Sequence, residues 1–200
     1  MTKHNIFNIA LACAFISALL ISMVGFSNSC EEMYTNIIRI RIIPNSDSAE
    51  DQSLKLQIRD AVLSGSEDLF SETQTYKDAL TTAENNIELF EHIANEEIKK
   101  AGFDYSVSVQ IRNEYFETRE YDDFTLPAGV YKTAVFTVGE GKGQNWWCVV
   151  FPQVCVGSCS GKLTDTVSES TAELAYNSDR YVIRFKTVEI FEKIKNYLDF

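Results

Sequence analysis

Isoleucine and arginine alternate in residues 35–43, and this spacing predicts the first strand of the chain. An alternation of apolar and polar residues places one set of side chains on each side of a strand. We therefore expect the isoleucines to be buried and the arginines to face solvent. The alternating residues are Ile38, Arg39, Ile40, Arg41 and Ile42.

The next two apolar patterns have the spacing of helices. Apolar residues recur every three or four positions after Ser48, which forms a capping box with Asp51. This pattern predicts a helix from about residue 50 to Ser64 that ends at Gly65. The same spacing predicts a second, longer helix from Tyr76, with Lys99 and Lys100 in its last turn and Gly102 as its stop.

Beyond residue 102 the spacing returns to two, which predicts strands. Residues 105–111 form one strand, and residues 114–121 form another strand or a bend. Residues 130–138 and 145–151 are β-branched and aromatic, and the glycine-rich segment 139–143 between them predicts a hairpin. That segment lacks both the glycine spacing and the following helix of a phosphate loop, so we interpret it as a flexible turn.

The C-terminal third has the weakest pattern. Residues from about 156 to 178 are rich in Ser, Thr, Gly and acidic residues, which predicts a long mobile loop that can hold a short helix. A short strand is expected at residues 180–185 and a closing helix at residues 188–198. Together the elements predict an α+β fold: an antiparallel or mixed sheet of about five strands, packed with two or three helices.

The N-terminus has the pattern of an export segment. Lys3 is the only charged residue before Glu31, residues 6–26 are apolar or small, and the small-residue triplet 27–29 follows. This order is typical of a secretory signal peptide. The apolar run is also about 20 residues long, enough to cross a bilayer as an uncleaved membrane anchor. Both interpretations export the remainder, a single extracytoplasmic domain of residues 30–200.

Composition and charge exclude several functions. The chain has 29 acidic and 18 basic residues and a net charge of −11, which argues against binding to nucleic acid or to anionic lipid headgroups. Its only histidines are His4 and His92, which leaves most histidine-dependent catalysis and metal binding out of reach. We expect no cofactor, no metal and no small-molecule substrate.

The cysteines favour a disulfide over a metal site. We prefer a pair between Cys148 and Cys155, with Cys159 as the competing partner, and buried free thiols as the alternative. Zinc is disfavoured because the spacings of seven and four residues form no CxxC pair and no histidine is near. Cys148 and His92 are also a poor nucleophile and base, since apolar residues surround the first and glutamates the second.

Adjacent aromatic residues stand out more than any catalytic motif. Trp146 and Trp147 follow one another, so in a strand they face opposite sides of the sheet. One can fill the core, while the other lies under a neighbouring element or is presented to a partner. Arg119 and Tyr121 belong to a second aromatic cluster, which is either core or a recognition patch.

Several of these segments resemble the stage II sporulation protein R family of endospore-forming bacteria. They follow the order of the family and cover most of residues 37–155. Pro44 and Cys159 depart from its pattern. The resembling segments are residues 45–48, 51–55, 59–63, 115–121, 126–131 and 143–152, followed by Cys155.

The resemblance implies a signalling protein without catalytic residues of its own. Family members are made in the forespore and exported into the space between the forespore and mother-cell membranes. There they activate a membrane-embedded aspartic protease of the mother cell, which then processes the precursor of the early mother-cell sigma factor.

On this hypothesis we expect the protein to contact the protease through a few residues: Trp146, Trp147, Arg119, Tyr121 and the turn from Asn45 to Asp47. For the turn, the alternative role is hydrogen bonding within the turn and the helix cap. The alternative function is a cell-envelope hydrolase that acts on peptidoglycan or peptide through acidic residues within 114–123. It predicts a deep pocket that holds a carboxyl group with a raised pKa.

Overall fold

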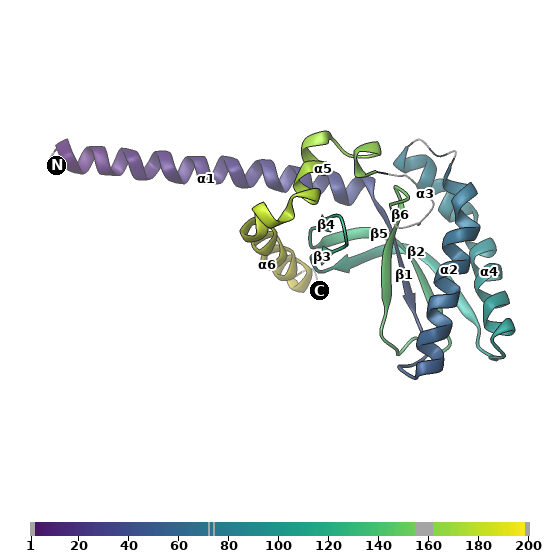
Figure 1. The fold of residues 1–200 in the computed structure, drawn as a ribbon. Helices are drawn as coiled ribbons and strands as arrows, with labels where there is room; N and C mark the ends of the chain where they lie inside the picture. The colour runs from purple at the N-terminus through teal and green to yellow at the C-terminus, as the bar shows by residue number, and fades with distance from the viewer. Residues whose placement is uncertain (1–2, 72, 74, 155–161, 199–200) are drawn as a thin grey trace. The chain divides into compact units, whose positions relative to one another are not determined.

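The computed structural model describes residues 3–71, 73, 75–154 and 162–198, and its elements gather into two compact units. We call them the helical unit (Met1–Met33, Glu117–Gly129 and Glu169–Phe200) and the sheet unit (Tyr34–Phe116 and Val130–Ser168). The elements are α1 (Lys3–Asn36), β1 (Ile38–Ile43), α2 (Ala49–Ser71), α3 (Tyr76–Asn85), α4 (Ile87–Lys100), β2 (Val107–Phe116), β3 (Arg119–Glu120), β4 (Thr125–Leu126), β5 (Gly129–Val138), β6 (Trp146–Phe151), η1 (Leu163–Asp165), α5 (Glu169–Tyr176), η2 (Ser178–Tyr181) and α6 (Val182–Leu198) (Figure 1).

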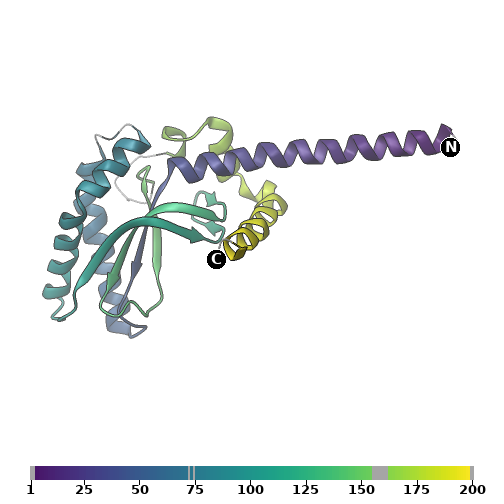
Figure 2. The ribbon, with the colours of Figure 1, turned by 180° about the vertical axis from the view of Figure 1, so that it is seen from behind.

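The sheet unit is built on a mixed sheet of four strands in the order β2-β5-β1-β6 (Figure 2). β1 runs parallel to β5, with Ile40 opposite Ala134, and antiparallel to β6, with Ile40 opposite Cys148. The α+β class and the mixed sheet predicted from the sequence are therefore confirmed. The predicted hairpin of residues 130–138 and 145–151 is wrong, because β1 lies between these two strands.

The prediction that the arginines of β1 face solvent is also wrong, because this strand lies inside the sheet. Arg39 is 0% exposed, and its guanidinium carbon lies 3.7 Å from the ring centre of Phe116 and 4.9 Å from that of Tyr131. Arg41 is half-buried and forms an ion pair with Glu114. The arginines thus occupy a covered face, where aromatic rings and a carboxylate compensate for lost water.

α2 and α4 lie side by side against the sheet (Figures 1 and 2). Both helices bury a stripe of residues spaced three or four apart, as the sequence predicts. α2, however, continues past Gly65 to Ser71. A Cβ atom at Gly65 would lie 2.8 Å from Cδ1 of Ile93, so this glycine permits close packing of α2 on α4 and does not end the helix. The stripes are Leu54, Ile58 and Val62 on α2 and Phe90, Ala94 and Ile98 on α4.

The second predicted helix is two helices, α3 and α4, that meet at Asn86. Asn86 has φ −114° and ψ 20°, which is not helical, and its side-chain amide donates a hydrogen bond of 2.8 Å to the carbonyl of Thr82. Asparagine competes for backbone hydrogen bonds in this way, which favours a break in a helix.

The helical unit contains most of α1, the short β3–β4 pair, α5, η2 and α6. Phe26 of α1 packs edge-on against Phe185 of α6, with ring centres 5.1 Å apart. The strand expected at residues 180–185 is wrong, because η2 and α6 make this segment helical. The loop expected at about 156–178 contains η1 and α5, while its residues 155–161 lie outside the described part.

Candidate interaction sites

Hydrogen bonds join the loop between β1 and α2 to the loop between β5 and β6. We call these two loops, residues 44–48 and 139–145, the loop clasp. The side-chain oxygen of Asn45 accepts a hydrogen bond of 3.0 Å from the backbone N–H of Glu140. A carboxylate oxygen of Asp47 accepts one from the backbone N–H of Gln144. Both predicted contact residues therefore have partners inside the protein.

Asp51, in the first turn of α2, accepts hydrogen bonds from the loop clasp. This side chain is 3% exposed, and one of its oxygens accepts hydrogen bonds from Ser46 Oγ (2.6 Å) and Asn45 Nδ2 (3.0 Å). Burial alone would raise the pKa of Asp51, but the hydrogen bonds from Ser46 and Asn45 lower it overall. The backbone N–H of Asp51 also donates 3.1 Å to Ser48 Oγ, the cap predicted from the sequence.

Two glycines allow the loops of the clasp to touch. A Cβ atom at Gly143 would lie 2.1 Å from the carbonyl oxygen of Ser46, and one at Gly139 would lie 2.4 Å from Oδ1 of Asn45. Gly139 also has φ +55°, a backbone conformation that favours glycine. The glycine-rich segment thus serves close packing against the turn at Asn45, which its spacing alone does not reveal.

Lys55 adds a charged group beneath the clasp. Its Nζ donates 2.9 Å to the carbonyl of Gln144, and the side chain is buried. Burial lowers the pKa of Lys55, while the nearby carboxylate of Asp47 partly opposes this effect. The lysine completes the link between α2 and the start of β6.

The two tryptophans begin the edge strand β6, directly after the clasp. Both are half-buried, so each ring is partly packed and partly accessible. The guanidinium carbon of Arg59 lies 5.5 Å from the ring centre of Trp146. Cys148 is buried and disulfide-bonded, while Cys155 of the predicted pair lies outside the described residues.

The other two predicted contact residues lie in the helical unit. Arg119 is exposed on β3, and Tyr121 follows it with a half-buried ring. Tyr121 stacks on Phe124 with ring centres 4.7 Å apart, and its backbone N–H donates 2.8 Å to the carbonyl of Phe124. The structure therefore groups Asn45 and Asp47 near the start of β6 in one unit, and Arg119 and Tyr121 in the other.

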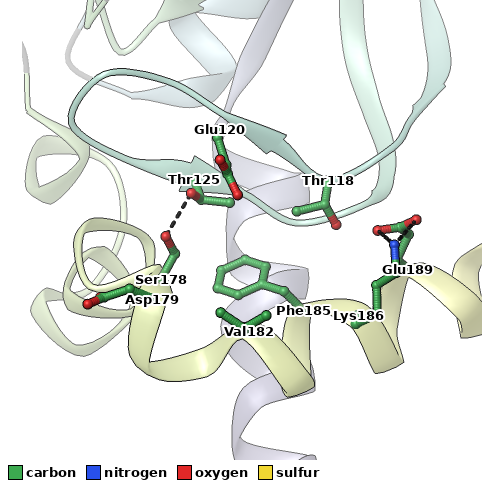
Figure 3. A pocket seen from close by; sticks show the side chains of 9 residues that line it. All are labelled: Thr118, Glu120, Thr125, Ser178, Asp179, Val182, Phe185, Lys186 and Glu189. Carbon is green, nitrogen blue, oxygen red and sulfur yellow. Dashed lines mark hydrogen bonds and ion pairs between the residues drawn. The ribbon is translucent and has the colours of Figure 1, made fainter.

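A pocket of about 510 Å³ lies in the helical unit, between the β3–β4 pair and α6 (Figure 3). Its walls combine the apolar side chains of Val182 and Phe185 with several polar ones, and a hydrogen bond of 2.8 Å from Thr125 to Ser178 closes one side. Sequence reasoning missed this pocket, because no local pattern connects its two segments. The remaining lining residues are Thr118, Glu120, Asp179, Lys186 and Glu189.

The charges around the pocket neutralise one another in part. Lys186 and Lys193 bind Glu189 at 3.0 and 3.1 Å, and Lys193 also binds Glu117 at 2.8 Å. The bond from Lys186 is the main cause that lowers the pKa of Glu189, although burial acts against it. A carboxyl group with a lowered pKa is a poor general acid at neutral pH.

Within the part of the chain that the structure describes, no group of three or more His, Cys, Asp or Glu side chains is arranged to hold a metal ion. Across those same residues, no helix has both the length and the hydropathy needed to cross a membrane.

Comparison with known proteins places the chain in a family. The model of the family described as stage II sporulation protein R matches residues 34–160, which cover most of the sheet unit and the segment Glu117–Gly129 of the helical unit. The chain is 38% identical to stage II sporulation protein R of Bacillus subtilis (strain 168) over 118 residues. That alignment covers 59% of this chain and 53% of its relative, so the chain matches about half the relative's length. No solved structure matches. With more than half of its residues matched by the family model, the chain belongs to the stage II sporulation protein R family.

Proposed function

We propose that this sporulation protein is an exported ligand that activates a membrane-embedded aspartic protease of the mother cell. The protease then removes the pro-segment from the precursor of the early mother-cell sigma factor. The family match over residues 34–160 carries the proposal, because it falls on the sheet unit with its loop clasp and adjacent tryptophans. A ligand of this kind acts by binding the active state of the protease more tightly than the inactive state.

The loop clasp suits a ligand because it fixes the start of β6. Asp51, Lys55 and the backbone of residues 139–145 hold the turn at Asn45 in one arrangement. A surface that is rigid before binding loses little conformational entropy when it binds. We propose that Trp146 and Trp147 supply the main contact area, with Asn45 and Asp47 shaping the surface beside them.

Arg119 and Tyr121 are proposed as a second contact group. Arg119 is exposed on β3, and the stacking of Tyr121 on Phe124 holds that aromatic ring in a fixed orientation. Tyrosine and arginine are frequent among the residues that dominate protein interfaces.

Electrostatics favour the ligand over the alternative hydrolase. The hydrolase requires a carboxyl group whose pKa is raised. Asp51, Glu140 and Glu189 each have a lowered pKa instead. Glu114, within the acidic segment that the hydrolase would use, forms ion pairs with Arg41 and Arg112.

Export remains part of the proposal. The signal-peptide pattern of residues 1–29 supports transfer out of the cytoplasm, into the space between the two membranes. The disulfide bond of Cys148 is compatible with this location, because disulfides persist in oxidising compartments outside the cytoplasm.

The tryptophan contact is tested in vesicles that hold the protease, with cleavage of the sigma-factor precursor as the readout. Trp146→Ala should raise the concentration of the protein needed for half-maximal cleavage by roughly tenfold or more, as expected for a dominant interface residue. Leu89→Ala is the control, because Leu89 is also a partly exposed apolar residue of the sheet unit. Unchanged cleavage by a folded Trp146→Ala variant would remove Trp146 from the interface.

A further inference from the structure

α6 carries an apolar surface with no partner in the described structure. Counted at about 100° per residue, all but one of its exposed apolar side chains fall in an arc of roughly 120°. The residue outside the arc is Val182, and Thr187 is the only polar residue within it. The side chains in the arc are Ile183, Ile190, Phe191, Ile194, Tyr197 and Leu198.

The opposite side of α6 faces the helical unit. Phe185 and Val188 are buried there, and Phe185 packs edge-on against Phe26 of α1. Phe185 lies about 180° around the helix from the centre of the apolar arc and Val188 about 120°, so packing within the unit leaves the arc facing outward. The exposed fractions of Ile183 and Tyr197, 82% and 81%, agree with this geometry.

Basic residues border the apolar arc on both sides. Lys186 and Lys193 follow one margin, and Arg184 and Lys195 follow the other, as counted around the helix. The lysines are well exposed, with 66%, 47% and 57% of the side chains of residues 186, 193 and 195 accessible. The two acidic residues, Glu189 and Glu192, lie on the half that faces the unit and are only 12% and 11% exposed.

We propose that α6 docks on the surface of an anionic lipid membrane. The apolar arc would enter the boundary between headgroups and acyl chains, while the bordering lysines and arginine reach the phosphates. The lysines form ion pairs with Glu117, Glu189 and Glu192, but such partly exposed pairs are weak and can be exchanged for phosphate. This arrangement of an apolar face with basic margins is typical of helices that lie in the membrane interface.

The negative net charge of the whole chain argues against docking on anionic lipid, but it does not describe α6. α6 holds four of the 18 basic residues and two of the 29 acidic ones, so its sign is opposite to that of the whole chain. Screening limits the reach of exposed charges to about 8 Å at physiological salt, so the charges closest to the membrane determine the electrostatic attraction. A second copy of α6 is a poorer occupant, because it would bring like charges together.

α1 of the same unit strengthens the case for lipid as the occupant. It exposes further apolar side chains, and the chain has no acidic residue before Glu31. A bilayer surface is one partner that accepts apolar surfaces from both helices. α6 lies outside the family match of residues 34–160, so this proposal is independent of the protease-activating function. The exposed residues of α1 are Ile6, Phe7, Ile9, Leu11, Phe15 and Val24.

The test is hydrogen exchange of the full chain with two kinds of vesicle: phosphatidylcholine alone, and phosphatidylcholine mixed with phosphatidylglycerol. We expect the mixed vesicles to slow exchange in the peptides of residues 182–198, and the neutral vesicles to have much less effect. The double variant I190E/I194E should lose this protection and bind the mixed vesicles about tenfold or more weakly. V130E is the control, because Val130 is an exposed apolar residue outside α6.

The readout separates α6 from α1. The proposal is overturned if the mixed vesicles leave hydrogen exchange of residues 182–198 unchanged, even if they slow exchange in α1. Equal protection by neutral vesicles also overturns it, since the basic margins would then have no role. Equal loss of protection in V130E contradicts a specific role of the apolar arc. A circular dichroism spectrum of each variant verifies that it is folded.

Discussion

The guanidinium of Arg39 lies close to two aromatic rings in the interior of the sheet unit. Phe116 contributes the nearer ring, at 3.7 Å, and Tyr131 the other, at 4.9 Å. A charge in this position is stabilised by the electrons of the rings, and the buried side chain fills space in the core. The stability of the sheet unit should therefore depend strongly on this arginine.

Arg39→Ala should lower the free energy of unfolding by about 2–4 kcal/mol, because it leaves a cavity and removes the contacts with both rings. Chemical denaturation measures the change. Arg112→Ala is the matched control, since that side chain is 48% exposed and its ion pair with Glu114 contributes less than about 1 kcal/mol. Equal effects of the two substitutions would contradict the buried role of Arg39.

Asp51 should make stability depend on pH. Its folded-state pKa is below its ordinary value, so the carboxylate stabilises the fold fully above the unfolded pKa of about 3.9. This contribution is lost as the pH falls through the folded-state pKa. Asp51→Asn should lower the free energy of unfolding at neutral pH by about 1–3 kcal/mol and flatten its dependence on acid.

Denaturation between about pH 3 and pH 7 tests this prediction. Glu50→Gln is the control, because Glu50 is an exposed neighbour in the same turn of α2. An acid dependence that is the same in Asp51→Asn and in the unsubstituted protein would show that Asp51 does not anchor the clasp.

Single residues were predictable where the cause is local. The cap at Ser48 depends on residues three positions apart, and the structure contains its hydrogen bond to Asp51. The burial of Arg39 depends on Phe116 and Tyr131, which are distant in sequence, so alternation in β1 alone predicts solvent exposure instead.

At the scale of elements, the glycine-rich loop is a packing element of the clasp. Gly143→Ala should lower the free energy of unfolding by about 1–3 kcal/mol, because the added methyl group meets the backbone of Ser46. It should also speed hydrogen exchange in residues 44–48 and 139–145, which must separate to admit it.

Gly102→Ala is the control for this substitution. Gly102 has φ +81° but open space around its Cβ position, so alanine there costs only the backbone term of about 1–2 kcal/mol. Exchange in the clasp should stay unchanged in this control. Faster hydrogen exchange in the loop clasp of Gly102→Ala would contradict the packing role of Gly143. Unchanged exchange in the loop clasp of Gly143→Ala would contradict it as well.

The positions of helices and strands were easier to predict than which of them pair or pack together. Apolar spacing located the strands and the helical stripes, since each depends on a few consecutive residues. It failed for the pairing of β5 and β6, because β1, which precedes them by many residues, inserts between the two strands. Apolar spacing also failed at Gly65, because Ile93, which lies close to this glycine, belongs to another helix.

At the scale of the whole molecule, the family match covers most of the sheet unit and only residues 117–129 of the helical unit. Residues 34–160 carry the match, while α6 and nearly all of α1 lie outside it. The pocket next to α6 was not predictable, because it joins residues 118–125 to residues 178–189 through tertiary packing alone. The contact residues proposed from the sequence are divided between the two units, so substitutions in each unit can be assayed separately.

We propose that this protein switches on a protease and performs no chemistry itself. The direct measurement is cleavage of the sigma-factor precursor by the protease in vesicles, with and without the purified protein, and with a protease whose catalytic aspartate is replaced as the control. We predict that cleavage depends on the concentration of the protein and is absent with the inactive protease. Cleavage at the same rate without the protein, or cleavage that the protein supports with the inactive protease, would contradict the claim.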